Sequence, residues 1–202
     1  MTTQTFSRFF SLVFLTLFAL AVSPGIQATD DWSTLHAKKQ TKLGLYMTAQ
    51  QAYDHTMANM DETLFLDIRT PSELNYLGAP TVMDAHVPTV IMDISAWNDK
   101  KHRYNRAENR NFIADVGAQL KKKGLSKNDT VILMCRSGKR SASAANMLAE
   151  AGYTKVYSVV DGYEGDKAKD GEHKGQRTVN GWKNTGLPWT YSLDRDLMYF
   201  SK

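Results

Sequence analysis

The sequence predicts an α/β domain built around a central parallel sheet. Nearly uninterrupted apolar runs, such as Leu64–Ile68 and Val131–Met134, are typical of strands that are buried on both faces. Segments with helical spacing alternate with these runs, and an alternation of strand and helix favours parallel pairing. At 202 residues the chain has room for one ordinary domain with extensions, and no internal repeat is present.

The first 28 residues have the layout of a secretory signal. Arg8 is their single charge, Phe9–Val22 is an uncharged apolar run, and Ile26-Gln27-Ala28 provides a small-residue exit. The run is short for a membrane span, which favours cleavage after Ala28 over the alternative of an uncleaved anchor. We therefore expect an exported, periplasmic protein that has no membrane contact once the signal is removed.

The remaining chain is expected to divide into a leader at 29–44, a domain at 45–191 and a tail at 192–202. The leader is polar, and Trp32 is the residue that could dock it onto the core. Residues 163–181 are rich in Gly, Lys, Asp and Glu without apolar periodicity, which indicates a loop inserted into the domain.

Acidic and histidine side chains in that inserted loop invite comparison with metal sites. Their spacing matches no calcium-loop pattern, so we expect neither a metal ion nor another cofactor. The residues concerned are Asp166, Asp170, Glu172 and His173.

The first half of the domain is predicted to contain two strands and two helices. Leu45–Met47 is a candidate short strand, and Thr48 with Gln51 has the spacing of a capping box that opens a helix through about Asn59. After the strand Leu64–Ile68, the pair Pro71-Ser72 indicates a turn into a short helix.

The middle of the chain is predicted to contain a strand, a connection and a helix. The strand lies within Val82–Met92, and the basic segment Lys100–Arg110 is interpreted as a solvated loop. The alternative for that segment is a rim that attracts an anionic substrate or an acidic partner. Apolar residues from Phe112 to Leu120 follow helical spacing, and Gly124 ends this helix.

The last part of the domain continues the alternation. The strand Val131–Met134 precedes a helix predicted over Ser141–Ala151, and Lys155–Val160 is a further strand. The aromatic segment Trp182–Tyr191 has enough apolar mass to close the edge of the domain.

The overall charge argues against a nucleic-acid-binding protein. The chain has 25 basic and 21 acidic residues, a net charge of +4, and no basic stretch is interleaved with aromatic residues. A small anionic substrate met by a local cationic patch is sufficient to explain this balance. We expect no nucleic acid among the partners.

Cys135 is the single cysteine, and it lies between the strand Val131–Met134 and the following helix. Helix N-terminal N–H groups and the charges of Arg136, Lys139 and Arg140 favour an anion at the sulfur, so the thiol should be substantially thiolate near neutral pH. An inert core cysteine is the alternative. An exported chain with one cysteine cannot form an internal disulfide, so Cys135 is either inert and buried or a working thiol.

The loop length distinguishes two kinds of thiolate chemistry. Phosphate and arsenate chemistry on this architecture uses Cys-x5-Arg, but that spacing from Cys135 reaches Ser141, and the arginine comes one residue early at Arg140. A loop that is one residue shorter suits a smaller anion than phosphate, namely the single extra sulfur atom of a persulfide.

Three segments resemble rhodanese-type sulfurtransferases. Cys135-Arg136-Ser137-Gly138-Lys139-Arg140-Ser141 resembles the active loop of that family, Leu66–Glu73 its upstream signature and Ala85–Pro88 its His-x-Pro segment. The resemblance covers roughly Met47 to Pro188. It implies a rhodanese-like fold, in which a central parallel five-stranded sheet has helices on both faces.

The resemblance also implies roles for individual residues. Cys135 would be the catalytic nucleophile, and Asp67, Arg69 and Ser141 would support the active loop, although Asp67 and Arg69 could equally be a structural ion pair. His86 is left out of the catalytic set. The residues implied to bind the substrate are Arg136, Ser137, Gly138, Lys139 and Arg140.

The implied reaction moves sulfane sulfur from a small anionic donor, such as thiosulfate, to a thiophilic acceptor. The acceptor would be a thiol or a cyanide-like molecule, or a partner protein. Two alternatives stay open: a non-enzymatic rhodanese-fold binding module that docks a partner in a periplasmic complex through the inserted loop, and, less favoured by loop length, a cysteine-dependent phosphatase or arsenate reductase.

Overall fold

A computed structural model of the chain describes residue 1 and residues 31–200. The predicted signal segment therefore lies, apart from Met1, outside the described residues. Among the helices of the described part, none has the length and apolar character that crossing a membrane requires.

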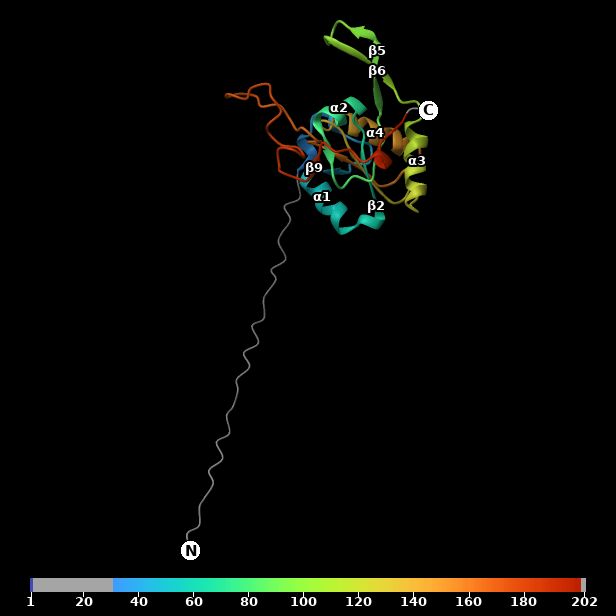
Figure 1. The fold of residues 1–202 in the computed structure, drawn as a ribbon, viewed down its shortest axis with the longest axis vertical. Coiled ribbons are helices and arrows are strands. Elements are labelled where there is room, and N and C mark those ends of the chain that lie inside the picture. The colour runs from blue at the N-terminus through green and yellow to red at the C-terminus, as the bar shows by residue number, and fades with distance from the viewer. Residues whose placement is uncertain (2–30, 201–202) are drawn as a thin grey trace. The chain divides into compact units, whose positions relative to one another are not determined.

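A five-stranded sheet forms the centre of the domain (Figure 1). All its strand pairs are parallel, and the spatial order is β1-β8-β7-β2-β4, which confirms the predicted fold class. The strands are β1 Tyr46–Met47, β2 Thr63–Asp67, β4 Ala85–His86, β7 Thr130–Met134 and β8 Val156–Val159.

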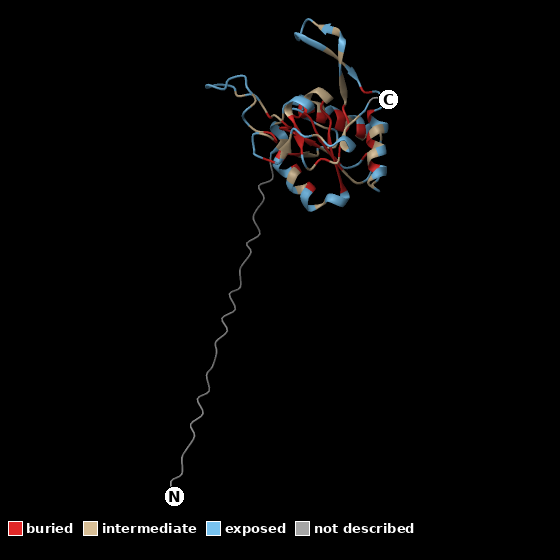
Figure 2. Ribbon diagram, viewed as in Figure 1, coloured by how far each residue is buried: buried red, intermediate tan, exposed pale blue. Residues whose placement is uncertain are grey.

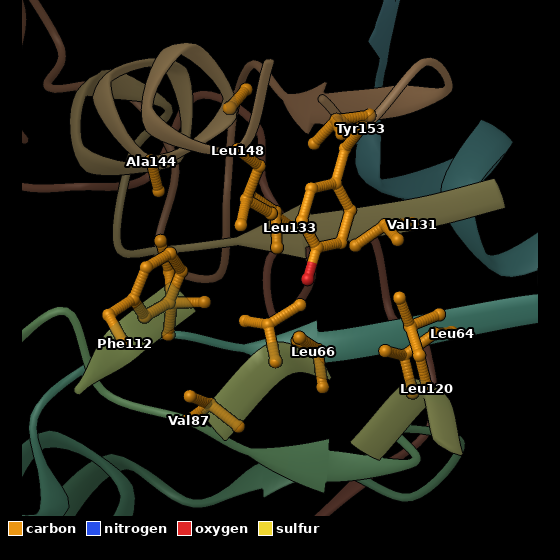
Figure 3. Packing of buried hydrophobic residues seen from close by; sticks show 14 of the residues in the cluster. Leu64, Leu66, Val87, Phe112, Leu120, Val131, Leu133, Ala144, Leu148 and Tyr153 are labelled. Atoms are coloured by element: carbon orange, nitrogen blue, oxygen red, sulfur yellow. The ribbon is translucent and has the colours of Figure 1, made fainter. Parts of the chain in front are cut away.

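Helices cover both faces of this sheet, as predicted. They are α1 Ala49–Ala58, α2 Pro71–Leu77, α3 Phe112–Lys122 and α4 Lys139–Glu150. Because side chains alternate along a strand, Leu66 points to the face covered by α3 and α4, while Phe65 points to the face covered by α1 and α2. Figure 3 shows the first of these two cores, and Figure 2 shows the buried residues concentrated between the layers.

The local signals for the first two helices act as expected. Thr48 and Gln51 form the predicted capping box at the start of α1. A second capping box joins Thr70 and Glu73 at the start of α2, with Pro71 in its first turn.

The helix after the cysteine begins earlier than predicted. It starts at Lys139 and not at Ser141, because Gly138 adopts a left-handed conformation with φ of 87° and turns the chain directly into the helix. Lys139 and Arg140 therefore lie in the first turn of α4.

The short strand predicted within Val82–Met92 is present as β4. The segment between β4 and α3 forms a long antiparallel hairpin, so the prediction of a solvated loop over Lys100–Arg110 was wrong. Its strands are β5 Val90–Asn98 and β6 Arg103–Glu108, with a register shift between Asp93 and Trp97. We call this hairpin the arm, and Figure 1 shows it extending away from the central sheet. Its composition reads as a loop because neither face is buried, so no apolar alternation marks the strands.

Aromatic residues close the edge of the domain, as predicted. Trp182 is fully buried, and its ring lies 5.4 Å from that of Phe65. A small antiparallel sheet joins β3 Ala79–Pro80 to β9 Trp189–Thr190. Four 3-10 helices complete the described elements: η1 Trp32–Thr34, η2 Ala37–Lys39, η3 Met60–Glu62 and η4 Arg195–Leu197.

The leader and the inserted loop both lie against the domain. The ring of Trp32 contacts that of Tyr46 at 5.7 Å, and Lys39, which is buried, forms a 2.9 Å ion pair with Asp166 of the inserted loop. The loop contains two isolated bridges, Lys167 with Arg177 and Ala168 with Lys174.

Candidate active site

Cys135 follows β7 directly, at the carboxyl edge of the sheet where ligands of open α/β folds bind. It is 1% exposed, and its carbonyl oxygen accepts a 2.8 Å hydrogen bond from the N–H of Tyr163. The carbonyl of Met134, the residue before Cys135, accepts a 2.9 Å hydrogen bond from the N–H of Ile68. Hydrogen bonds therefore hold the backbone at Cys135 and at the residue before it.

The loop that follows Cys135 presents free backbone donors. Within residues 31–200, the N–H groups of residues 136–141 make no hydrogen bond to the protein. Three of them belong to the first turn of α4, where a helix leaves its N–H groups unsatisfied and carries partial positive charge. Such a set of donors is suited to an anion held at the start of the helix.

Two serines connect the thiol to the adjacent strand. The Sγ of Cys135 lies 3.6 Å from the Oγ of Ser141, and Ser158 on β8 donates a 2.9 Å hydrogen bond to that same hydroxyl. Ser141 in turn donates to the carbonyl of Gly138 at 3.0 Å or of Val159 at 3.3 Å. Ser158 is fully buried, so this chain of hydroxyls is shielded from water.

Two glycines allow the loop and its neighbour to approach closely. A Cβ on Gly138 would lie 2.0 Å from the carbonyl oxygen of Val160, and a Cβ on Gly162 would lie 2.6 Å from the carbonyl oxygen of Cys135. Both glycines have positive φ, so a side chain would also strain the backbone. Residues 160–162 thus form a wall against which the cysteine loop rests.

The cations of the loop have different partners. The Nε of Arg136 lies 2.5 Å from a carboxylate oxygen of Glu164, whereas Lys139 is exposed and has no ion-pair partner among residues 31–200. Arg140 donates two hydrogen bonds to Glu73, at 2.8 and 2.6 Å. The predicted donor-binding charges of Arg136 and Arg140 are therefore partly balanced by the protein itself.

The pair of Arg140 and Glu73 is a strong one. Burial acts to raise the pKa of Glu73, but the hydrogen bonds and charge of Arg140, together with hydrogen bonds from Thr70, bring it down to about 2. The same pair raises the pKa of Arg140 although burial acts to lower it. Both groups are consequently ionised at any working pH, and the pair ties α4 to the start of α2.

Asp67 and Arg69 form a fully buried ion pair beside the loop. Arg69 Nη2 donates a 2.6 Å hydrogen bond to the Asp67 carboxylate and a 2.8 Å hydrogen bond to the Gly78 carbonyl. Its guanidinium stacks on the ring of Tyr163 at 3.6 Å. Since the Tyr163 N–H bonds to Cys135, the pair contacts the backbone support of the cysteine, not the sulfur.

His86 is also buried, and it is the β4 residue that pairs with Asp67. Its Nε2 lies 2.8 Å from the Arg69 carbonyl, and burial lowers its pKa. A neutral imidazole that donates to this carbonyl fits a structural role.

Comparison with known proteins identifies the family to which this chain belongs. Residues 48–169 match the rhodanese-like domain family. The chain belongs to that family. The crystal structure of Rv0390 from M. tuberculosis is similar, with 30% sequence identity and a TM-score of 0.52, over 72% of this chain and 96% of that one.

Curated relatives of this rhodanese-like protein also occur in Rickettsia. A protein of Rickettsia conorii is 28% identical over 141 residues, which are 70% of this chain and 93% of the relative. A protein of Rickettsia prowazekii is 26% identical over the same length and coverage. Both are described only as uncharacterized proteins.

The rhodanese-like site contains residues that sequence reasoning missed. Ser158 gives no signal in the sequence, because it reads as one more position of a buried strand. Arg177 of the inserted loop donates a hydrogen bond to the carbonyl of Gly165, the residue after Glu164. Burial, and to a smaller extent the charge of Arg136, lowers the pKa of Arg177. Arg106 of the arm is half-buried. Its burial, and to a smaller extent the charge of Arg140, lowers the pKa of Arg106. The basic character of Lys100–Arg110 was the only sequence signal for Arg106.

Proposed function

We propose that this protein is a sulfurtransferase that works through a persulfide on Cys135. The observation that carries the proposal is the set of N–H groups at 136–141, in the loop and helix start that follow Cys135, which have no hydrogen-bond partner among residues 31–200. A persulfide sulfur is anionic, and these donors with the helix N-terminus can stabilise it without any cofactor.

The first half-reaction would load the cysteine. The Cys135 thiolate attacks the outer sulfur of thiosulfate, a bond forms between the two sulfurs, and the sulfur–sulfur bond of the donor breaks. Sulfite leaves with the electron pair of that bond, so no oxidant is consumed. Cys135 is 1% exposed, which favours a small donor such as thiosulfate for the loading step.

The second half-reaction would unload the persulfide. A thiolate or cyanide attacks the outer sulfur, and Cys135 leaves as a thiolate. Because the chain has one cysteine, no second thiol of the same chain can resolve the persulfide. The acceptor must therefore come from another molecule.

Phosphate or arsenate chemistry is less well supported. Arg140, the arginine of the loop, is held by a bidentate contact to Glu73 and follows the cysteine by five residues. A tetrahedral oxyanion is normally clamped by an arginine whose fork is free. Cysteine-dependent turnover of a phosphate ester would revive this alternative.

The proposal is tested by the mass of the intact protein after incubation with thiosulfate. We expect an adduct of about 32 Da on the wild type, since persulfidation adds one sulfur atom, and its removal by cyanide. Cys135→Ser should show no adduct and should fold normally, because the two side chains differ by one atom. Absence of the adduct on the wild type with both thiosulfate and polysulfide would contradict the proposal.

Export is proposed on separate grounds. It rests on the charge and apolar pattern of residues 1–28, and it places the reaction in the periplasm. Expression of the full chain in a Gram-negative host, followed by fractionation and intact mass, tests it. A periplasmic protein that begins at Thr29 is expected, and a cytoplasmic protein that retains Met1 would contradict it.

A further inference from the structure

The arm displays apolar side chains to solvent. Ile94 is 77% exposed, Trp97 52% and Tyr104 48%. Figure 2 shows that the arm carries exposed and intermediate residues along its outer length, whereas the buried residues belong to the domain below. Exposed apolar clusters with aromatic residues are typical of surfaces that bind other proteins.

These side chains are held in defined positions. Trp97 and Tyr104 are paired across the two strands, and their rings pack edge to face at 5.4 Å. At the turn, the Lys101 N–H donates both to the carbonyl and to the side chain of Asn98. A two-stranded hairpin is marginally stable on its own, so a surface that packs against this one would stabilise it.

The end of the arm is cationic. The turn at 99–103 carries three positive side chains, Lys100, Lys101 and Arg103, against one carboxylate, Asp99. Asp93, lower on the arm, accepts hydrogen bonds from both the N–H and the hydroxyl of Ser95. The apolar residues are thus accompanied by a net charge of +2 at the end of the arm (three cations and one carboxylate), which complements an acidic surface.

The arm starts at the same edge of the sheet as the thiol. β5 follows the carboxyl end of β4, and Cys135 follows the carboxyl end of β7, which is parallel to it in the same sheet. The base of the arm is fixed there by the Thr89 N–H, which donates to the Ile68 carbonyl at 3.3 Å, and by the Asn109 N–H, which donates to Thr89 at 2.9 Å.

A cleft joins the base of the arm to the helix that follows the cysteine. Its volume is about 220 Å³, and its lining includes Val90 and Glu108 of the arm and Arg140 and Met147 of α4. A molecule that contacts the arm and this cleft therefore lies beside the cysteine loop.

We propose that the arm docks an acidic protein whose cysteine thiol accepts sulfur from Cys135. This rests on the proposed sulfurtransferase function and names the class of its acceptor. The thiolate of the partner attacks the outer sulfur of the persulfide, a sulfur–sulfur bond forms on the partner, and the bond to Cys135 Sγ breaks. The electron pair returns to Cys135 as a thiolate, and no oxidant is needed.

The dimensions of the arm favour a protein over a small acceptor. β5 has nine residues and so extends over roughly 25–30 Å, at about 3.3 Å per residue. A small thiol would contact only a few of these residues. A protein surface can contact Trp97, the cationic end and the cleft beside Arg140 together.

The test uses two synthetic peptides, each with one cysteine and several leucines, one rich in Asp and Glu and the other rich in Lys. Wild-type protein loaded with persulfide should transfer sulfur to the acidic peptide several-fold faster, at equal thiolate concentration, than to the basic one. The charge reversal K100E/K101E should abolish this preference. The matched reversal K121E/K122E, at the exposed end of α3, should retain it, because it changes the net charge equally outside the arm.

The apolar part of the arm is tested with exposed aromatic residues. Trp97→Ser should weaken binding of the acidic peptide several-fold in calorimetric titration, whereas Tyr76→Ser, an exposed aromatic outside the arm, should not. Both side chains are more than half exposed, so neither variant should affect folding. Transfer to cyanide should be unchanged in K100E/K101E.

Docking and chemistry are measured separately. Binding of the acidic peptide, with its cysteine alkylated, to the Cys135→Ser protein reports on docking alone. If the wild type never forms a persulfide, the proposed function fails, while this titration still tests the arm. If K100E/K101E keeps the acidic preference, or binds the alkylated peptide as tightly as the wild type, the arm is not the docking element. Arm-dependent binding to phosphatidylglycerol vesicles without peptide binding would also overturn the proposal.

Discussion

The hydroxyl of Ser158 donates a 2.9 Å hydrogen bond to the hydroxyl of Ser141. This contact places a buried donor behind the group that lies 3.6 Å from the Cys135 sulfur. When Cys135 ionises, Ser141 can turn its proton from a backbone carbonyl to the thiolate, while Ser158 continues to donate to the Ser141 oxygen. Such a chain strengthens the donor at its end.

Removal of the Ser158 hydroxyl should therefore disfavour the thiolate. We expect Ser158→Ala to slow the alkylation of Cys135 about fivefold at pH 7, the equivalent of one hydrogen bond of about 1 kcal/mol. The rate of reaction with iodoacetamide measures this effect. Ser143→Ala, at an exposed position of α4, is the control and should react at the wild-type rate. Equal rates in wild type and Ser158→Ala would show that Ser158 has no influence on the thiol.

The wall behind the cysteine loop should tolerate no side chain. We expect Gly162→Ala to destabilise the protein by more than about 2 kcal/mol and to slow persulfide formation, because its Cβ would lie 2.6 Å from the Cys135 carbonyl oxygen. Gly171→Ala is a matched control, since Gly171 has a similar φ of 69° and no atom within 4 Å of an added Cβ. It should cost only about 1 kcal/mol of backbone strain. Urea unfolding and persulfide kinetics are the measurements, and equal costs for the two variants would contradict the steric explanation.

The Glu73–Arg140 pair should make stability depend on acid pH. The folded pKa of Glu73 is about 2 against an ordinary value of 4.5, so its contribution is complete above pH 4.5 and is lost as pH falls toward 2. The shift corresponds to stabilisation on the order of 3 kcal/mol. We expect Glu73→Gln to be less stable than the wild type at pH 7, and the difference to shrink between pH 4.5 and 2.

Denaturant unfolding at several pH values measures this difference. Glu62→Gln, at an exposed carboxylate, is the control and should follow the wild type across the whole range. A gap between wild type and Glu73→Gln that stays constant from pH 7 to 2 would mean that the pair does not lower the carboxylate pKa.

For the buried pair of Asp67 and Arg69, one test can distinguish a role in stability alone from a role in supporting the cysteine loop. Asp67→Asn should cost about 3–5 kcal/mol, because it leaves the Arg69 charge buried and uncompensated. The double variant Asp67→Leu with Arg69→Met should regain much of this stability. We expect it to load persulfide more slowly than the wild type, since the stacking of Arg69 on Tyr163 that supports the Cys135 carbonyl is lost. A stable double variant with the wild-type loading rate would assign the pair a purely structural role.

Much of the fold follows from signals that act within a few residues. The apolar run Leu64–Ile68, the capping box of Thr48 with Gln51 and the glycine stop at Gly124 each produce the element that the sequence predicts. These signals succeed because burial on both faces of a parallel strand and the unsatisfied N–H groups of a helix start impose strict local requirements. The arm was missed for the opposite reason: its strands pair with each other and are buried on neither face.

The sequence by itself determined the chemistry that is available at the site. It supplies one cysteine at the end of a buried strand, and a loop whose arginine comes one residue too early for a tetrahedral oxyanion. Only the tertiary structure decided the partners of these groups. Glu73, Glu164 and Ser158 lie far along the chain from the groups they contact, and the arm reaches the same edge of the sheet as Cys135. Such contacts depend on the packing of segments that are distant in sequence, and no local pattern records them.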